Sequence, residues 1–284
     1  MTLERHYTSS DGLKLFYRLY EPPRVSALPV LCLPGLTRHS GDFTSVAARL
    51  CAAGRRVVCP DLRGRGRSAY PADWRTYDPA WYFDDLRALL AIEGVHRFVA
   101  IGTSMGGLLG MAMGAAMPAS LAGLIVNDVG PEISPEGQGR ILDYISIDRP
   151  QQDWSSAARH IRKLLPNLSV ADEAGWIRVA KNTYREGADG LLHFDWDVNL
   201  HKAVRRGVDP DLDLWALWKS VAHLPILAVR GGVSDVLSPE TFARMKRTDP
   251  DLAQIELPGV GHTPSLEEPA SIEAIDEFLR RNEI

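Results

Sequence analysis

The chain has 284 residues, of which 45% are hydrophobic and 24% charged, and its formal net charge is −4. Such a composition is typical of a globular protein of one large or two modest domains. The small negative charge gives no electrostatic reason to expect nucleic acid or an anionic membrane as a partner.

The N-terminal segment and the cysteines bear on the compartment. The sequence MTLERHYTSSDG has no apolar run of the kind found in signal peptides. The longest nearly uncharged helical pattern, residues 105–117, is too short to span a bilayer. Cys32 and Cys59 lie inside apolar, strand-like runs, which favours buried thiols in a reducing compartment over a disulfide framework. We therefore expect a cytoplasmic protein.

Residues 1–131 alternate short apolar runs with helical patterns. Two runs, 2–8 and 13–20, flank the turn signal Ser10-Asp11-Gly12 and predict a β-hairpin. Further runs are rich in β-branched residues, as buried strands of a parallel sheet are: 29–33, 56–59, 98–102 and 121–127. Helical patterns lie between them at 42–53 and 79–92. This alternation predicts a doubly wound α/β sheet.

The pattern changes between residues 132 and 217. This region has few β-branched runs and predicts a helical insertion with helices at 155–165, 171–185 and 213–221. The α/β alternation then resumes with strands at 225–230 and 254–257 and helices at 239–247 and 271–281. We expect a mostly parallel, eight-stranded sheet built from residues 1–131 and 218–284.

One serine lies at a strand-to-helix junction. The stretch Gly102-Thr103-Ser104-Met105-Gly106 follows a predicted strand and opens a predicted helix. A G-x-S-x-G pattern is weak alone, but this context is that of a nucleophile elbow. The two glycines allow the strained turn. The helix N-terminus supplies free N–H groups, so the Met105 N–H is a candidate oxyanion donor.

A serine hydroxyl needs a base, and on such elbows an acid and then a histidine follow along the chain. Of the histidines after residue 200, only His262 lies in a glycine-rich loop after the last predicted strand. We predict that His262 is the base.

Two carboxylates are candidates for the acid that orients this histidine. Asp235 follows the predicted strand 225–230 and is our prediction. Asp128, at the end of the predicted strand 121–127, is the alternative. It would otherwise be a loop carboxylate bonded to backbone N–H groups.

The loop after the predicted strand 29–33 should supply the second oxyanion donor. Gly35 lets the backbone turn, and the Leu36 N–H is the expected donor. Residues of this loop and aromatic residues of the insertion are candidates for the substrate pocket. The alternative for the loop residues is a solvated loop, and the stronger alternative for the aromatic residues is the core of the insertion. These candidates are Arg38, His39, Trp154, Phe194 and Trp196.

Several of these stretches together resemble the α/β-hydrolase superfamily. They are Leu33-Pro34-Gly35, Asp61-Leu-Arg-Gly-Arg-Gly-Arg-Ser68, Gly102–Gly107, Gly232-Val-Ser-Asp235 and Gly261-His262. The resemblance spans residues 29–266 and implies that the insertion is a cap over the nucleophile. A serine nucleophile argues against haloalkane dehalogenases and epoxide hydrolases. Thr103, where many C–C bond hydrolases have Asn, disfavours that activity. Arg65, where the family often has His, lies in a loop that is structural in the family.

We therefore expect a serine hydrolase that cleaves a carboxylic ester or lactone of a small, largely apolar molecule through an acyl-enzyme on Ser104. The chemistry needs no metal or organic cofactor. The alternatives are a C–C bond hydrolase of the meta-cleavage-product type, a perhydrolase or haloperoxidase-like activity, and a ligand sensor on a hydrolase scaffold. The expected partner is the small-molecule substrate, and the sequence leaves open whether the protein is a monomer or a homodimer.

Overall fold

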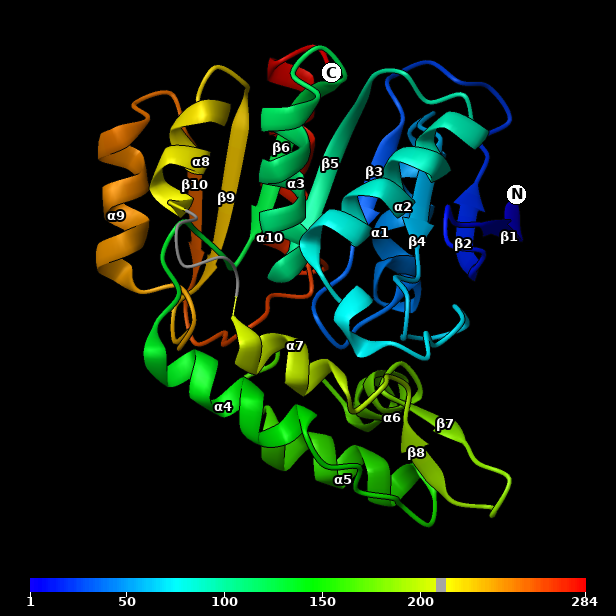
Figure 1. Cartoon of the computed structure of the whole chain (residues 1–284). Helices are drawn as coiled ribbons and strands as arrows, with labels where there is room; N and C mark the ends of the chain where they lie inside the picture. Colours follow the sequence, from blue (N-terminus) through cyan, green and yellow to red (C-terminus); the bar gives the residue numbers. More distant parts are fainter. Residues whose placement is uncertain (208–212) are drawn as a thin grey trace.

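A computed structural model describes residues 1–207 and 213–284, and its centre is an eight-stranded sheet of order β1-β2-β4-β3-β5-β6-β9-β10 (Figure 1). The strands are β1 (Thr2–Thr8), β2 (Lys14–Tyr20), β3 (Val30–Leu33), β4 (Val57–Pro60), β5 (Phe98–Thr103), β6 (Leu121–Asn127), β9 (Ile226–Gly231) and β10 (Ala253–Leu257). The β1–β2 and β2–β4 pairs are antiparallel and the others parallel. The predicted mostly parallel, eight-stranded sheet is confirmed.

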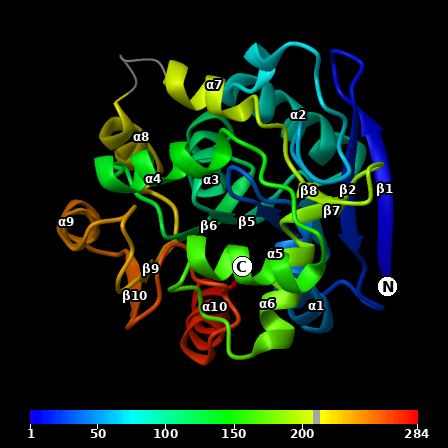
Figure 2. The same cartoon turned by 90° about the horizontal axis from the view of Figure 1, so that it is seen from below.

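Helices cover both faces of this sheet (Figure 2). On one face lie α1 (Thr44–Ala52) and α10 (Pro269–Arg281), and on the other α2 (Pro79–Ile92), α3 (Met105–Ala116) and α8 (Leu214–Val221); α9 (Pro239–Thr248) lies at the β10 end. Successive side chains of a strand point to opposite faces of the sheet, so each strand contributes to the core on both faces. In β3, Leu31 packs in the core under α2 and α3, whereas Cys32 packs in the core under α1 and α10. Each parallel strand is therefore apolar throughout, as its sequence predicts.

The insertion lies across the end of the sheet where the parallel strands finish (Figure 1). It contains α4 (Pro135–Ile145), α5 (Trp154–Leu164), α6 (Glu173–Lys181), α7 (Leu200–Arg206) and a hairpin of β7 (Tyr184–Glu186) and β8 (Leu192–Phe194). Two short 3-10 helices, η1 (Ser40–Phe43) and η2 (Trp74–Thr76), lie in loops of the sheet. The predicted boundary at residue 217 falls inside α8, which packs against α3 in the core. Residues 208–212, within the predicted insertion, lie outside the described residues.

Within the described ranges, no helix combines the length and the apolar character that crossing a membrane requires.

Candidate active site

Ser104 stands at a sharp turn between β5 and α3. Its backbone is strained, with φ 52° and ψ −120°. A methyl group on Gly106 would lie 2.1 Å from the Leu33 carbonyl oxygen, and one on Gly102 would lie 2.3 Å from the Gly106 carbonyl oxygen. Both positions therefore require glycine, and the turn leaves the Ser104 side chain at the end of the sheet that faces the insertion.

Ser104 begins a chain of two hydrogen bonds. Its Oγ lies 3.0 Å from Nε2 of His262, and Nδ1 of that ring lies 2.7 Å from Oδ2 of Asp128. The Asp128 side chain is 0% exposed and that of His262 is 9% exposed. In this arrangement an imidazole can take a proton from a hydroxyl while a buried carboxylate holds the ring.

The carboxylate that reaches the histidine is the alternative candidate, and the prediction that Asp235 does so is wrong. Asp128 follows β6 with φ 56°, which directs its side chain toward the turn after β9. There the carboxylate accepts a hydrogen bond of 2.8 Å from the Gly231 N–H and one of 2.6 Å from the Ser234 hydroxyl. The last residue of β9 and the turn after it thus contribute hydrogen-bond donors that stabilise the buried carboxylate. The acid itself comes from the end of β6.

Asp235 instead fastens the insertion to the core. Its carboxylate accepts two hydrogen bonds from the guanidinium of Arg140 in α4, one of them from Nη2 at 2.9 Å. Burial would raise the pKa of Asp235, but the hydrogen bonds and the positive charge of Arg140 outweigh it and hold the pKa below its ordinary value. Next to this pair, the Ser134 N–H donates to the Val236 carbonyl at 3.0 Å. The beginning of α4 is therefore fixed to the turn after β9.

The two predicted oxyanion donors belong to segments next to the serine, since Met105 follows it directly and Leu36 lies in the loop after β3. A methyl group on Gly35 would lie 3.8 Å from Cβ of Ser104, so the loop after β3 runs beside the hydroxyl. Met105 is the first residue of α3, and its N–H has no acceptor within that helix. Within residues 1–207 and 213–284, the Leu36 N–H likewise donates no hydrogen bond. Both N–H groups therefore lack an acceptor within the described residues and remain candidate oxyanion donors.

Asn127 is a residue of the site that the sequence analysis missed. Its Nδ2 donates to Oγ1 of Thr103 at 3.1 Å and to the carbonyl of Pro264 at 2.9 Å. It thereby ties the end of β5 and the end of β6 to the loop that carries His262. The available signal was a polar residue that ends an otherwise apolar strand.

A small cavity of about 30 Å³ lies between the loop after β3 and the insertion. Its lining residues are Thr37, Arg38, Tyr144, Ile161, Leu164, Leu165, Thr183 and Trp196. Arg38 and Trp196 were among the predicted pocket residues. The volume accommodates on the order of one water molecule, whereas ligand sites usually measure ~300 Å³ or more. Neither Ser104 nor His262 lines this cavity, so it does not by itself define the substrate pocket.

The other three predicted pocket residues pack elsewhere. His39 is buried and accepts a hydrogen bond of 3.1 Å from the Gly41 N–H through Nδ1. Phe194 is buried by stacking on Trp196, with 4.0 Å between ring centroids. Trp154 lies at the start of α5 with the Lys181 ammonium over its ring. Aromatic residues of the insertion mostly fill its own core.

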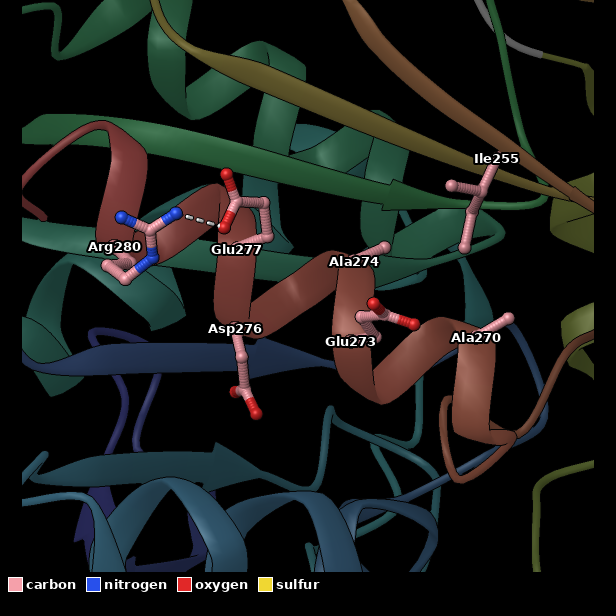
Figure 3. A pocket seen from close by; sticks show the side chains of 7 residues that line it. All are labelled: Ile255, Ala270, Glu273, Ala274, Asp276, Glu277 and Arg280. Atoms are coloured by element: carbon pink, nitrogen blue, oxygen red, sulfur yellow. Dashed lines mark hydrogen bonds and ion pairs between the residues drawn. The ribbon is translucent and has the colours of Figure 1, made fainter.

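A larger hollow of about 640 Å³ lies on the face of α10, beside β10 (Figure 3). It is lined by Ile255, Ala270, Glu273, Ala274, Asp276, Glu277 and Arg280. Figure 3 shows Arg280 paired with Glu277 along the helix. None of the residues hydrogen-bonded to Ser104 or His262 lines it, so its size does not make it part of this site.

The eight-stranded fold and the hydrogen bonds that join Ser104, His262 and Asp128 can now be compared with those of known protein families. Residues 30–275 match the model of the alpha/beta hydrolase family. The chain belongs to this family, and the resemblance found in its sequence is confirmed.

Individual relatives are similar to this chain over most of its length. The chain is 33% identical over 266 residues to a 3-hydroxybutyrate-oligomer hydrolase of Cupriavidus necator, covering 90% of this chain and 88% of the relative. It is 24% identical to a 2-(acetamidomethylene)succinate hydrolase of Mesorhizobium japonicum, over 88% of this chain and 87% of that one. Among solved structures, an alpha/beta hydrolase from Novosphingobium aromaticivorans is 45% identical with a TM-score of 0.92, and the match covers 99% of this chain and 98% of that one.

Proposed function

We propose that the protein is a serine hydrolase of carboxylic esters, with Ser104 as nucleophile, His262 as base and Asp128 as the acid that orients it. The observation that carries this proposal is the pair of hydrogen bonds, 3.0 Å from Ser104 Oγ to His262 Nε2 and 2.7 Å from His262 Nδ1 to Asp128 Oδ2. Both lengths suit proton transfer and ring orientation without rearrangement.

The reaction follows from these contacts. Ser104 Oγ attacks the ester carbonyl carbon as Nε2 of His262 takes its proton, and the carbonyl oxygen becomes an oxyanion that the Leu36 and Met105 N–H groups bind. His262 then returns the proton to the leaving alkoxide, and the acyl group stays on Ser104. Water attacks the acyl-enzyme with His262 again as base, which releases the acid and restores the hydroxyl. A lactone reacts in the same way, and its alkoxide stays attached to the acyl group.

The substrate class that we favour is a short hydroxy acid joined through ester bonds. The relative of Cupriavidus necator is named as a hydrolase of 3-hydroxybutyrate oligomers.

The test is a panel of chromogenic esters of increasing acyl length, a lactone and the linear dimer of 3-hydroxybutyrate, each assayed with wild type and Ser104→Ala. We expect wild-type turnover on short acyl chains and on the dimer, and none above background with Ser104→Ala. Mass spectrometry of a rapidly quenched reaction should find the acyl group on the peptide that contains Ser104. A wild type no faster than Ser104→Ala on every ester and lactone would refute the proposal.

A further inference from the structure

Arg65 carries a buried positive charge without a negative partner. It lies in the loop after β4, and its side chain is 0% exposed. No carboxylate of residues 1–207 or 213–284 forms an ion pair with it, although the neighbouring Arg63, also 0% exposed, pairs with Asp85 and Asp11. The same loop thus holds one compensated and one uncompensated guanidinium.

The polar contacts of Arg65 are to neutral groups. Nε donates to the Leu36 carbonyl at 2.6 Å, and Nη1 donates to the Arg63 carbonyl at 2.6 Å and to the Tyr82 hydroxyl at 2.8 Å. The Tyr82 ring lies 4.9 Å from Cζ of Arg65. These groups accept hydrogen bonds from Nε and Nη1 and leave the net charge in place. Burying an uncompensated ion costs several kcal/mol, and folds seldom retain one without a use for it.

The neighbours of Arg65 indicate what its charge can do. Arg65 contacts both residues whose N–H groups are the proposed oxyanion donors. It donates to the carbonyl of Leu36, and its Nη2 lies 4.0 Å from Sδ of Met105. The guanidinium therefore lies next to both proposed oxyanion donors, near where negative charge develops during acyl transfer.

We infer that Arg65 is a positioning residue of the oxyanion site: it holds the Leu36 backbone in place, and its unpaired charge stabilises the tetrahedral anion formed on Ser104. This inference rests on the proposed hydrolysis. The neutral ground-state ester gains little from the charge, so Arg65 should act on kcat more than on KM.

The expected size of the effect follows from distance. From the 2.6 Å bond to the Leu36 carbonyl, ordinary backbone dimensions place the oxyanion about 8 Å from the guanidinium. Two unit charges at that separation, in a medium of effective dielectric constant about 20, correspond to roughly thirtyfold in rate.

The experiment compares Arg65→Gln, which keeps an amide donor and removes the charge, with Arg65→Lys, which keeps the charge. The readouts are kcat and KM on the best ester of the panel and the inhibition constant of butaneboronic acid, which forms an anionic tetrahedral adduct with a serine. A matched control is the double variant Arg63→Gln with Asp85→Asn, which removes the compensated guanidinium of the same loop together with the charge of Asp85, the buried one of its two partners. Its expected effect is on the melting temperature, with kcat as in wild type.

We expect Arg65→Gln to lower kcat and to weaken butaneboronic acid binding by roughly thirtyfold each, with KM little changed, and Arg65→Lys to keep most of both. Equal losses in the Gln and Lys variants, or an equal loss of kcat in the Arg63 control, would overturn the inference. Turnover by wild type that exceeds Ser104→Ala, together with full activity of Arg65→Gln, overturns it while the proposed hydrolysis stands.

If Arg65→Gln fails to fold, Arg65→His provides the same test. Its boronic acid affinity relative to wild type should fall as the introduced imidazole loses its charge between about pH 5 and 8. A ratio independent of pH would overturn the inference.

Discussion

The strongest prediction concerns Asp128→Asn, because the donors around the carboxylate dictate which way the new amide must face. The Gly231 N–H donates to Oδ1 and cannot accept, so the amide oxygen of Asn must occupy that position. The amide NH2 then takes the place of Oδ2, where His262 Nδ1 now lies at 2.7 Å. Nδ1 must become the acceptor, which moves the imidazole proton to Nε2, where it faces Ser104.

A histidine in that tautomer cannot deprotonate the serine. The expected loss is about 10⁴ in kcat, equivalent to about 5.5 kcal/mol of transition-state stabilisation. Steady-state kinetics on the best ester of the panel measures it, and circular dichroism checks that the variant is folded.

The matched control is Asp235→Asn, which removes the other carboxylate that follows a neighbouring strand. We expect it to lower kcat by less than about tenfold, because Asp235 pairs with Arg140 and makes no hydrogen bond to His262. The reasoning is refuted if Asp235→Asn is the more damaging change, or if Asp128→Asn stays within about tenfold of wild type.

Three further predictions concern the elbow and the attachment of the insertion. Gly106→Ala should lower the melting temperature sharply or prevent folding, because its methyl group would lie 2.1 Å from the Leu33 carbonyl oxygen; a wild-type melting curve would contradict this. Arg140→Ala should make α4 more sensitive to limited proteolysis, while β-sheet signals in circular dichroism stay unchanged; unaltered cleavage would show that the ion pair does not hold the helix. Since the folded pKa of Asp235 is lowered, its pair with Arg140 should stabilise the fold above the ordinary carboxyl value of 3.8 and stop doing so as the pH falls through the lowered value. The melting-temperature difference between wild type and Asp235→Asn should therefore be present at neutral pH and vanish in acid; a difference independent of pH would be evidence against it.

Sequence reasoning was sufficient for the sheet because buried parallel strands leave a strong pattern. The run 121–127 is apolar up to its last residue, and the structure has β6 with the same bounds. The hairpin of β7 and β8 was missed because each strand has three residues, too few for any periodicity to be recognised.

The acid could not be assigned from sequence for a geometric reason. Asp128 and Asp235 both follow strands, and β6 and β9 are neighbours in the sheet, so their loops compete for one histidine. The choice depends on the left-handed backbone of Asp128 and on the arrival of Arg140 from the insertion. Neither has a sequence signature, because the first is a single dihedral angle and the second is a contact over 95 positions.

The insertion is held to the core along two sides. Residues 195–197 join the backbone of the Arg65 loop: the Gly66 N–H donates to Asp195 at 3.0 Å, the Asp197 N–H donates to Gly64 at 2.8 Å, and Arg65 and Trp196 form a β-bridge. The other side is attached to the turn after β9 by the Arg140–Asp235 pair and by the Ser134 N–H, which donates to the Val236 carbonyl at 3.0 Å. It is also attached to the loop that carries His262, because the Gly261 N–H donates to the Asn167 carbonyl at 2.7 Å. The insertion is therefore bonded both to the loop that carries Arg65 and to the loop that carries His262. The segment that covers the serine is thus coupled to the loops that perform the chemistry, so substitutions in the insertion should change kcat as well as KM.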